Sequence, residues 1–117
     1  MRKILSLVAD ASALVSLASV SLLPLVLSEF DVVVTGIVVG ELKAMSTFDD
    51  AHGRAETLVL EKIDSMRVVN TSDHQRFMTS KIDCGEASCL EIIDGGGCDY
   101  LLTDDFRALG EKRKTDW

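Results

Sequence analysis

Four short runs of apolar residues recur along the chain, and each is predicted to form a β-strand. The runs cover residues 4–9, 31–35, 66–70 and 99–103. The second run, DVVVT, is dominated by β-branched residues, which favour extended backbone. Apolar residues follow one another in these runs without regular alternation. Both faces of such strands are therefore expected to be covered, as they are in a parallel sheet.

Between these runs, apolar positions recur every three or four residues, which predicts helices that bury one face. The predicted helices cover residues 11–20, 22–28, 37–46, about 50–65 and 86–93. The polar stretch 72–81 could also be helical, and a last helix could start at residue 106. Asp10 or Ser12 is placed to cap the first helix, because a side-chain oxygen there can accept a free N–H of the first turn.

The order of these elements predicts an α/β fold. Strands that alternate with helices form parallel sheets, with the helices packed on both faces. We therefore expect three layers, α/β/α, around a central, mostly parallel, four-stranded sheet. The sequence contains one proline and no linker-like or repeated segment, so residues 1–117 are expected to form a single domain.

The N-terminal segment has two interpretations. A basic start, Met1-Arg2-Lys3, followed by an apolar run is also typical of a signal peptide. However, Asp10 lies within the apolar run, and an acid at the centre of a membrane span costs about 2.5–3.5 kcal/mol. Serines and Pro24 interrupt the rest of the segment. A buried strand followed by a buried helix is the better interpretation, with no membrane association and a cytoplasmic location.

The three cysteines, Cys84, Cys89 and Cys98, fit neither a disulfide framework nor a zinc site, because their number is odd and no CxxC pair occurs. We expect reduced thiols, as in a cytosolic protein.

A net charge of −7 argues against a protein that holds nucleic acid through a broad basic surface. It does not exclude a nuclease, because carboxylates that bind cations add to the negative charge. The basic residues in 107–114 could contact a phosphate backbone, or they could be solvated surface.

Four acidic residues lie where the predicted fold would bring them together. Asp10 and Asp104 follow predicted strands, and Glu41 and Glu86 belong to predicted helices. In parallel α/β sheets, functional sites form beyond the carboxyl ends of the strands. Taken singly, each acid could instead be a helix cap, an exposed helix residue, a first-turn acid or a turn residue. Taken together, they predict a site for divalent cations, because Mg²⁺ and Mn²⁺ prefer oxygen ligands.

Four segments carry a resemblance to a known family. They are Val8 to Leu14 (VADASAL), Gly40-Glu41-Leu42, Asp83 to Ala87 (DCGEA), and Leu101 to Asp105 (LLTDD). In this order and at this spacing, the chain resembles the PIN-domain family of metal-dependent ribonucleases, which includes the VapC-type toxins. The resemblance extends over residues 3 to about 110. It departs from the family in two respects: the third acid is a glutamate, and the usual fifth strand is apparently missing or truncated.

The resemblance implies a specific site and reaction. Asp10 and Asp104 would be the central ligands of Mg²⁺ or Mn²⁺, and Glu41 and Glu86 would complete a site in which all four acids are also catalytic. Ser12, Thr103 and Asp105 are possible supporting residues. The chain would be an endoribonuclease that hydrolyses RNA phosphodiester bonds with a metal-activated water. It could be the toxin of a toxin–antitoxin pair, with RNA as substrate, an antitoxin protein as partner and a homodimer as its assembly.

Two other functions remain open. One is a catalytically weak PIN-like module that binds protein or RNA. The other is a response-regulator receiver, which is disfavoured because Asp10 stands alone after the first strand instead of in an acidic pair. The apolar residues around 17–27 could form a dimer face or part of the core.

Overall fold

The structure is a computed structural model that describes residues 5–47 and 51–103. Its centre is a four-stranded sheet in the order β3-β2-β1-β4. Every pair of neighbouring strands is parallel. The strands are β1 (Ser6–Ala9), β2 (Asp31–Thr35), β3 (Arg67–Val69) and β4 (Tyr100–Leu102). The predicted parallel sheet is confirmed, and the N-terminal apolar run is one of its two central strands.

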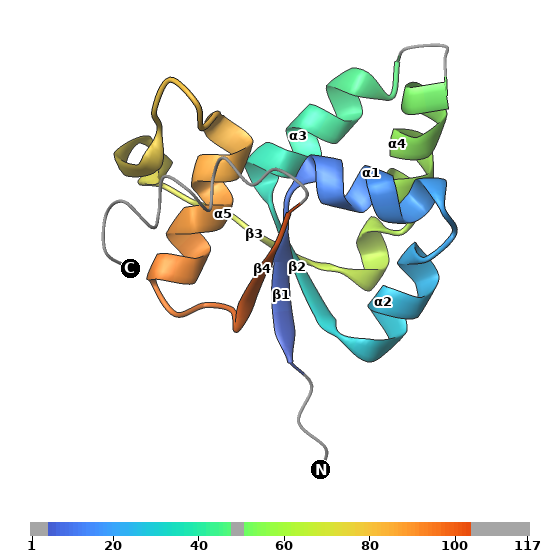
Figure 1. Cartoon of the computed structure of the whole chain (residues 1–117), viewed down its shortest axis with the longest axis horizontal. Helices are drawn as coiled ribbons and strands as arrows, with labels where there is room; N and C mark the ends of the chain where they lie inside the picture. The colour runs from blue at the N-terminus through green and yellow to red at the C-terminus, as the bar shows by residue number, and fades with distance from the viewer. Residues whose placement is uncertain (1–4, 48–50, 104–117) are drawn as a thin grey trace.

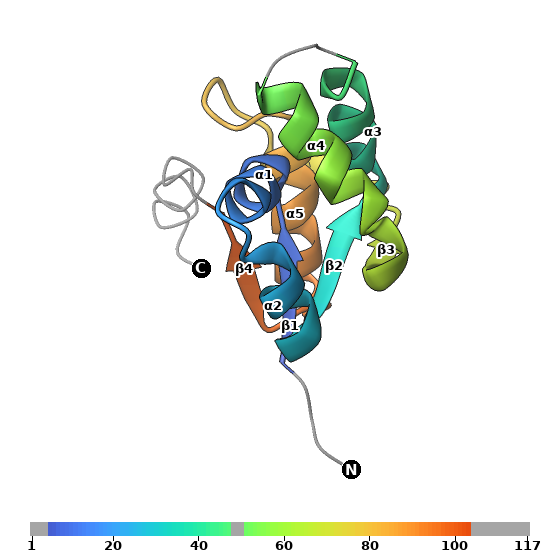
Figure 2. The same cartoon turned by 90° about the vertical axis from the view of Figure 1, so that its right-hand side faces the viewer.

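Helices cover both faces of this sheet, which confirms the three-layer prediction. Figures 1 and 2 place α1 and α2 on one face and α5 on the other, with α3 beyond the carboxyl end of β2. Helix α4 packs against both α1 and α3. The α-helices are α1 (Ala11–Ser19), α2 (Leu23–Glu29), α3 (Gly36–Met45), α4 (Ala51–Glu61) and α5 (Cys84–Asp94).

The strand register brings distant parts of the chain to one edge of the sheet. Ala9 at the end of β1 pairs with Leu102 at the end of β4, and the backbone N–H of Asp10 donates to the carbonyl of Leu102 at 3.2 Å. At the other end of the strands, the backbone N–H of Ser6 donates to the carboxylate of Asp99 at 2.8 Å. The residues that follow β1 and β4 are therefore held side by side.

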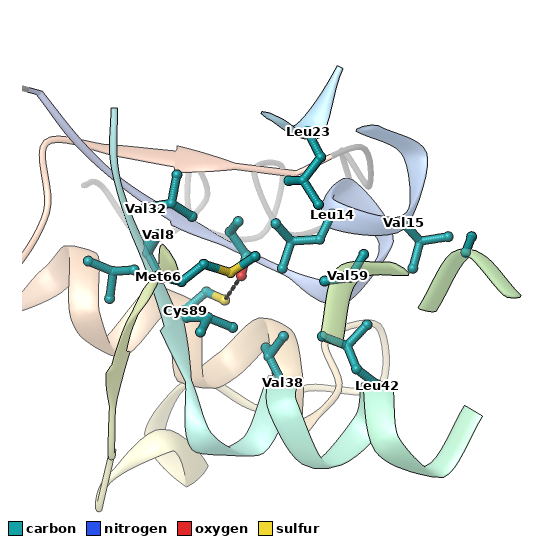
Figure 3. Packing of buried hydrophobic residues seen from close by; sticks show 14 residues of the cluster. Val8, Leu14, Val15, Leu23, Val32, Val38, Leu42, Val59, Met66 and Cys89 are labelled. Carbon is teal, nitrogen blue, oxygen red and sulfur yellow. Dashed lines mark hydrogen bonds between the residues drawn. The ribbon is translucent and has the colours of Figure 1, made fainter. Parts of the chain in front are cut away.

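The main hydrophobic core lies between β1 and β2 and the helices around them. Val32, Val33 and Val34 are all fully buried, as expected for an internal strand of a parallel sheet. Figure 3 shows Leu14, Val38, Leu42 and Val59 converging from α1, α3 and α4. A second, smaller cluster includes Ala87 and Leu90 of α5 together with Ile82, and Phe77 and Leu101 pack against it. Together these clusters anchor the starts of α1, α3 and α5.

Two predicted helices differ from the structure. The helix predicted to reach residue 65 ends at Glu61 and is followed by a short 3₁₀ turn, Ile63–Ser65. The polar segment 72–81 contains only the 3₁₀ turn His74–Phe77. The carboxylate of Glu91 on α5 accepts the backbone N–H of Asp73 at 2.9 Å, which fixes the start of this segment. The segment lacks apolar positions at helical spacing, so a longer helix there would have no face to bury.

Within the described residues, no single helix has the length and apolar character to span a membrane. Helices α1 and α2 reach that length only when taken together, and the chain bends by 117° between them.

Candidate metal-dependent active site

Asp10 lies at the carboxyl end of β1 and caps α1. Its Oδ1 accepts the backbone N–H of Ala13 at 2.8 Å and the hydroxyl of Ser12 at 3.1 Å. Its Oδ2 accepts the hydroxyl of Thr103, the first residue after β4. The Asp10 side chain is buried. Both of its oxygens are thus held in place, and the two hydroxyl residues suggested from the sequence are the ones that hold them.

Glu41 lies on α3 and points toward the start of α5. Its pKa is raised from the ordinary value of 4.5 to about 6, first because the side chain is half-buried and then because Asp83 repels its charge. A hydrogen bond from the backbone N–H of Gly85 acts in the opposite direction, and Asp10 raises the pKa further. Glu41 therefore faces two other carboxylates, Asp10 and Asp83, which belong to different elements of the fold.

Glu86 and Asp83 cap α5 reciprocally. The backbone N–H of Glu86 donates to Oδ1 of Asp83 at 2.9 Å, and Oε1 of Glu86 accepts the backbone N–H of Asp83 at 3.1 Å. This capping box satisfies two N–H groups that the first turn of the helix leaves open. One oxygen of Glu86, a predicted ligand, therefore has a structural role at the helix start. Asp83, the N-cap of α5, is an acid whose charge raises the pKa of Glu41.

Asp83 and Gly85 were not predicted from the sequence to be residues of the site. The signal was present, because an acid followed three residues later by Glu is a capping-box pattern. Both residues belong to the DCGEA segment. The capping box fixes the first turn of α5. Asp83, the cap residue, and Gly85 of that turn both face α3.

Cys89 on α5 lies against the end of β1, which is next to Asp10 in the chain. Its thiol donates to the carbonyl of Ala9 at 3.7 Å, the bond drawn in Figure 3. Burial raises the pKa of this thiol well above its usual value, and the charges of Asp10 and Glu41 raise it further. A thiol of this kind is inert and stays protonated. All three cysteines are unpaired, as the sequence predicted.

Asp104 and Asp105 lie outside the described residues, as does the basic segment 107–114. Within residues 5–47 and 51–103, no three His, Cys, Asp or Glu side chains are grouped closely enough to hold a metal ion. In the described part of the chain, Asp10 and Asp83 each lie close enough to Glu41 to raise its pKa. The prediction that Asp104 joins them stays a prediction.

Comparison with known families decides the classification. A family model described as a PIN domain matches residues 6–114. The chain belongs to the PIN-domain family. PIN domains are generally nucleases, and they typically use divalent metal ions. A comparison with curated proteins finds no match to this PIN domain.

The donor groups of this PIN domain fit a hard divalent cation. Asp10, Glu41 and Asp83 offer only oxygen atoms, which are the ligands that Mg²⁺ and Mn²⁺ prefer. Mg²⁺ is usually held by one or two carboxylates together with waters and phosphate oxygens, so a complete protein cage is not required. The repulsion that Asp10 and Asp83 exert on Glu41 is the repulsion that a bound cation would relieve.

Replacing Glu41 by Gln is expected to stabilise the metal-free protein at about pH 7.5. The pKa of Glu41 is higher in the folded chain than its ordinary value. The folded state therefore holds this proton more tightly, and stability is lost as the pH rises from about 4.5 to about 6. Glutamine removes this loss and keeps an oxygen for the N–H of Gly85. Because solvent screens the half-exposed side chain, the gain should stay below about 2 kcal/mol.

Urea denaturation of both proteins with EDTA, at about pH 4 and pH 7.5, measures this gain. It should be present at the higher pH and absent at the lower one. An equal gain at both pH values would show that ionisation of Glu41 is not its cause.

Proposed function

We propose that this PIN domain is an Mg²⁺- or Mn²⁺-dependent endoribonuclease that hydrolyses RNA phosphodiester bonds. Asp10, Glu41, Glu86 and Asp104 are the proposed metal-binding and catalytic acids, and Asp83 lies close to Glu41 and Glu86. Ser12 and Thr103 orient Asp10, and Asp105 is a possible supporting acid. The observation that carries the proposal is the buried Asp10 carboxylate, which is fixed at both oxygens and faces Glu41 across the carboxyl ends of the central strands.

The division of roles follows from the contacts of each side chain. Asp10 is held at both carboxylate oxygens and is suited to fix the position of a cation. Glu41 is half-buried and has a pKa near 6, so it exchanges a proton near neutral pH and is suited to accept one from a water. When bound, a divalent cation lowers the pKa of water and offsets negative charge on the scissile phosphate. The protein therefore does not need a broad basic surface to bring RNA to this site.

Cleavage of a mixed pool of structured and single-stranded RNA tests the proposal. The purified protein should cut the pool with Mn²⁺ or Mg²⁺ and should stop cutting with EDTA. Cleavage that persists in EDTA would contradict the metal-dependent reaction. A folded protein that binds Mn²⁺ but cuts nothing would favour the alternative, a PIN-like module that binds protein or RNA without efficient catalysis.

Homodimer formation is part of this proposal, and α1 and α2 supply its support. Residues 11–28 contain no charged side chain, and Val20, Leu22 and Leu25 are exposed there. Two copies of a chain with net charge −7 can approach each other most easily through an uncharged face. Light scattering of the purified protein should give twice the chain mass, and a monomer at all concentrations would contradict the dimer.

A toxin role in the cytoplasm, with an antitoxin as partner, belongs to the same proposal. The unpaired thiols of Cys84, Cys89 and Cys98 support a reducing compartment. Expression of the chain alone should arrest growth in a way that depends on Asp10. Growth that is unaffected by active protein would contradict the toxin role while leaving the nuclease in place.

A further inference from the structure

The carboxylate of Glu41 rests against a position on α5 that has no side chain. A Cβ added at Gly85 would lie 2.7 Å from Oε2 and 2.8 Å from Cδ of Glu41, and closer still to Oε1. Atoms at these distances overlap. The carboxylate therefore occupies the space that any other residue at position 85 would fill.

The backbone of Gly85 also contacts this carboxylate. Its N–H donates a hydrogen bond to Glu41. Gly85 lies in the first turn of α5, where backbone N–H groups have no partner within the helix and favour a negative charge. The glycine thus supplies both the space and the donor that hold Glu41.

A buried chain of hydroxyl groups fixes α5 against α3 at this point. The hydroxyl of Ser88 donates to the carbonyl of Gly85 at 2.7 Å. The Ser88 proton is engaged in this bond. In the 2.7 Å hydrogen bond between the Ser88 and Thr35 hydroxyls, Thr35 is therefore the donor. Thr35 in turn accepts the backbone N–H of Val38 and caps α3. Thr35 and Ser88 are both fully buried, so this chain locks the first turns of the two helices together.

We infer that Gly85 is a positioning residue that holds the Glu41 carboxylate so that it faces Asp10. The Thr35–Ser88 hydroxyl chain fixes Gly85 relative to α3. The expected effect of Gly85 on cleavage rests on the proposed nuclease function, whereas its positioning of the Glu41 carboxylate does not. A side chain at position 85 would displace the end of a flexible glutamate instead of the helix backbone. The site is therefore more sensitive than the fold to this substitution.

The test compares Gly85→Ala with Gly40→Ala. Gly40 precedes Glu41 on the same helix, and a Cβ added there meets nothing within 4 Å. Both changes put alanine into a helix, which favours folding to a similar extent. In metal-free crystals of Gly85→Ala, the carboxylate of Glu41 should move by about 1 Å to reach normal contact distance. RNA cleavage should fall about 10- to 100-fold, with no loss of melting temperature. Gly40→Ala should keep both the position of Glu41 and the activity.

Three results would overturn the inference. Glu41 could keep its position in Gly85→Ala, cleavage could be unchanged, or Gly85→Ala could fail to fold while Gly40→Ala folds. The last result would show that the glycine serves helix packing. If the unmodified protein cuts no RNA, only the nuclease proposal fails. The metal-free crystals still decide whether Gly85 positions the Glu41 carboxylate.

Discussion

Replacing Asp10 by Asn is expected to reduce RNA cleavage by about 10²- to 10³-fold while the protein stays folded. Asparagine caps helices as well as aspartate does, so the bond from the N–H of Ala13 to Oδ1 can persist. The negative charge is lost, and with it the attraction for a divalent cation. Loss of a few kcal/mol of transition-state stabilisation corresponds to this decrease in rate. Single-turnover cleavage rates in saturating Mn²⁺ measure the effect, and circular dichroism reports the fold.

Asp64→Asn is the matched control, because it removes the same charge from an exposed residue in the 3₁₀ turn that follows α4. It should cut RNA at the rate of the unmodified protein. Equal losses in both variants would point to net charge instead of a local site. Full activity in Asp10→Asn would remove Asp10 from the catalytic centre.

Mn²⁺ is expected to stabilise the protein strongly at neutral pH. A ligand present at about 100 times its dissociation constant contributes about 2.7 kcal/mol to the folded state. For a chain of this size, that contribution corresponds to an increase of about 10 °C in melting temperature. The physical reason is the repulsion that Asp10 and Asp83 exert on Glu41, which a bound cation would relieve. Thermal denaturation with increasing Mn²⁺ or Mg²⁺, and with EDTA, measures the increase.

The same titration at about pH 5 should give a smaller increase, because Glu41, with a pKa of about 6, is then mostly protonated. Asp10→Asn should also respond less than the unmodified protein. A melting temperature that does not change with metal at either pH would contradict the proposed metal site. An increase of the same size in Asp10→Asn would place the metal elsewhere.

The sequence predicted the fold well because the strands are marked by strong local signals. The run DVVVT forms β2 as predicted, and its consecutive buried valines reflect the parallel sheet. The signals were weak where structure depends on packing. The segment 72–81 has no apolar repeat, and its start is held by the carboxylate of Glu91 on α5, 18 residues away from Asp73 in the chain. No local pattern in the sequence specifies such contacts.

The candidate site could be predicted in part. The position of Asp10 follows from the strand that precedes it, and its contact with Thr103 follows from the parallel pairing of β1 with β4. The partnership of Glu41 with Gly85 and Asp83 could not be predicted, because it depends on the packing of α3 against α5. The capping role of Glu86 was considered as an alternative and is present in the structure. The capping-box pattern could have revealed the part that Asp83 plays in this cap. The sequence could not show that Asp83 also lies close to Glu41.

The pairing of β1 with β4 has a consequence for how the protein is made. Asp10 emerges early in synthesis, but one of its two oxygens is held by Thr103, which is 93 residues later in the chain. Strand β1 likewise lacks one of its two neighbouring strands until β4 has been made. A nascent chain on the ribosome therefore cannot complete the surroundings of Asp10 until nearly all of the domain has emerged. For a proposed RNA-cutting enzyme, this order of assembly would keep the growing chain inactive beside its own messenger RNA.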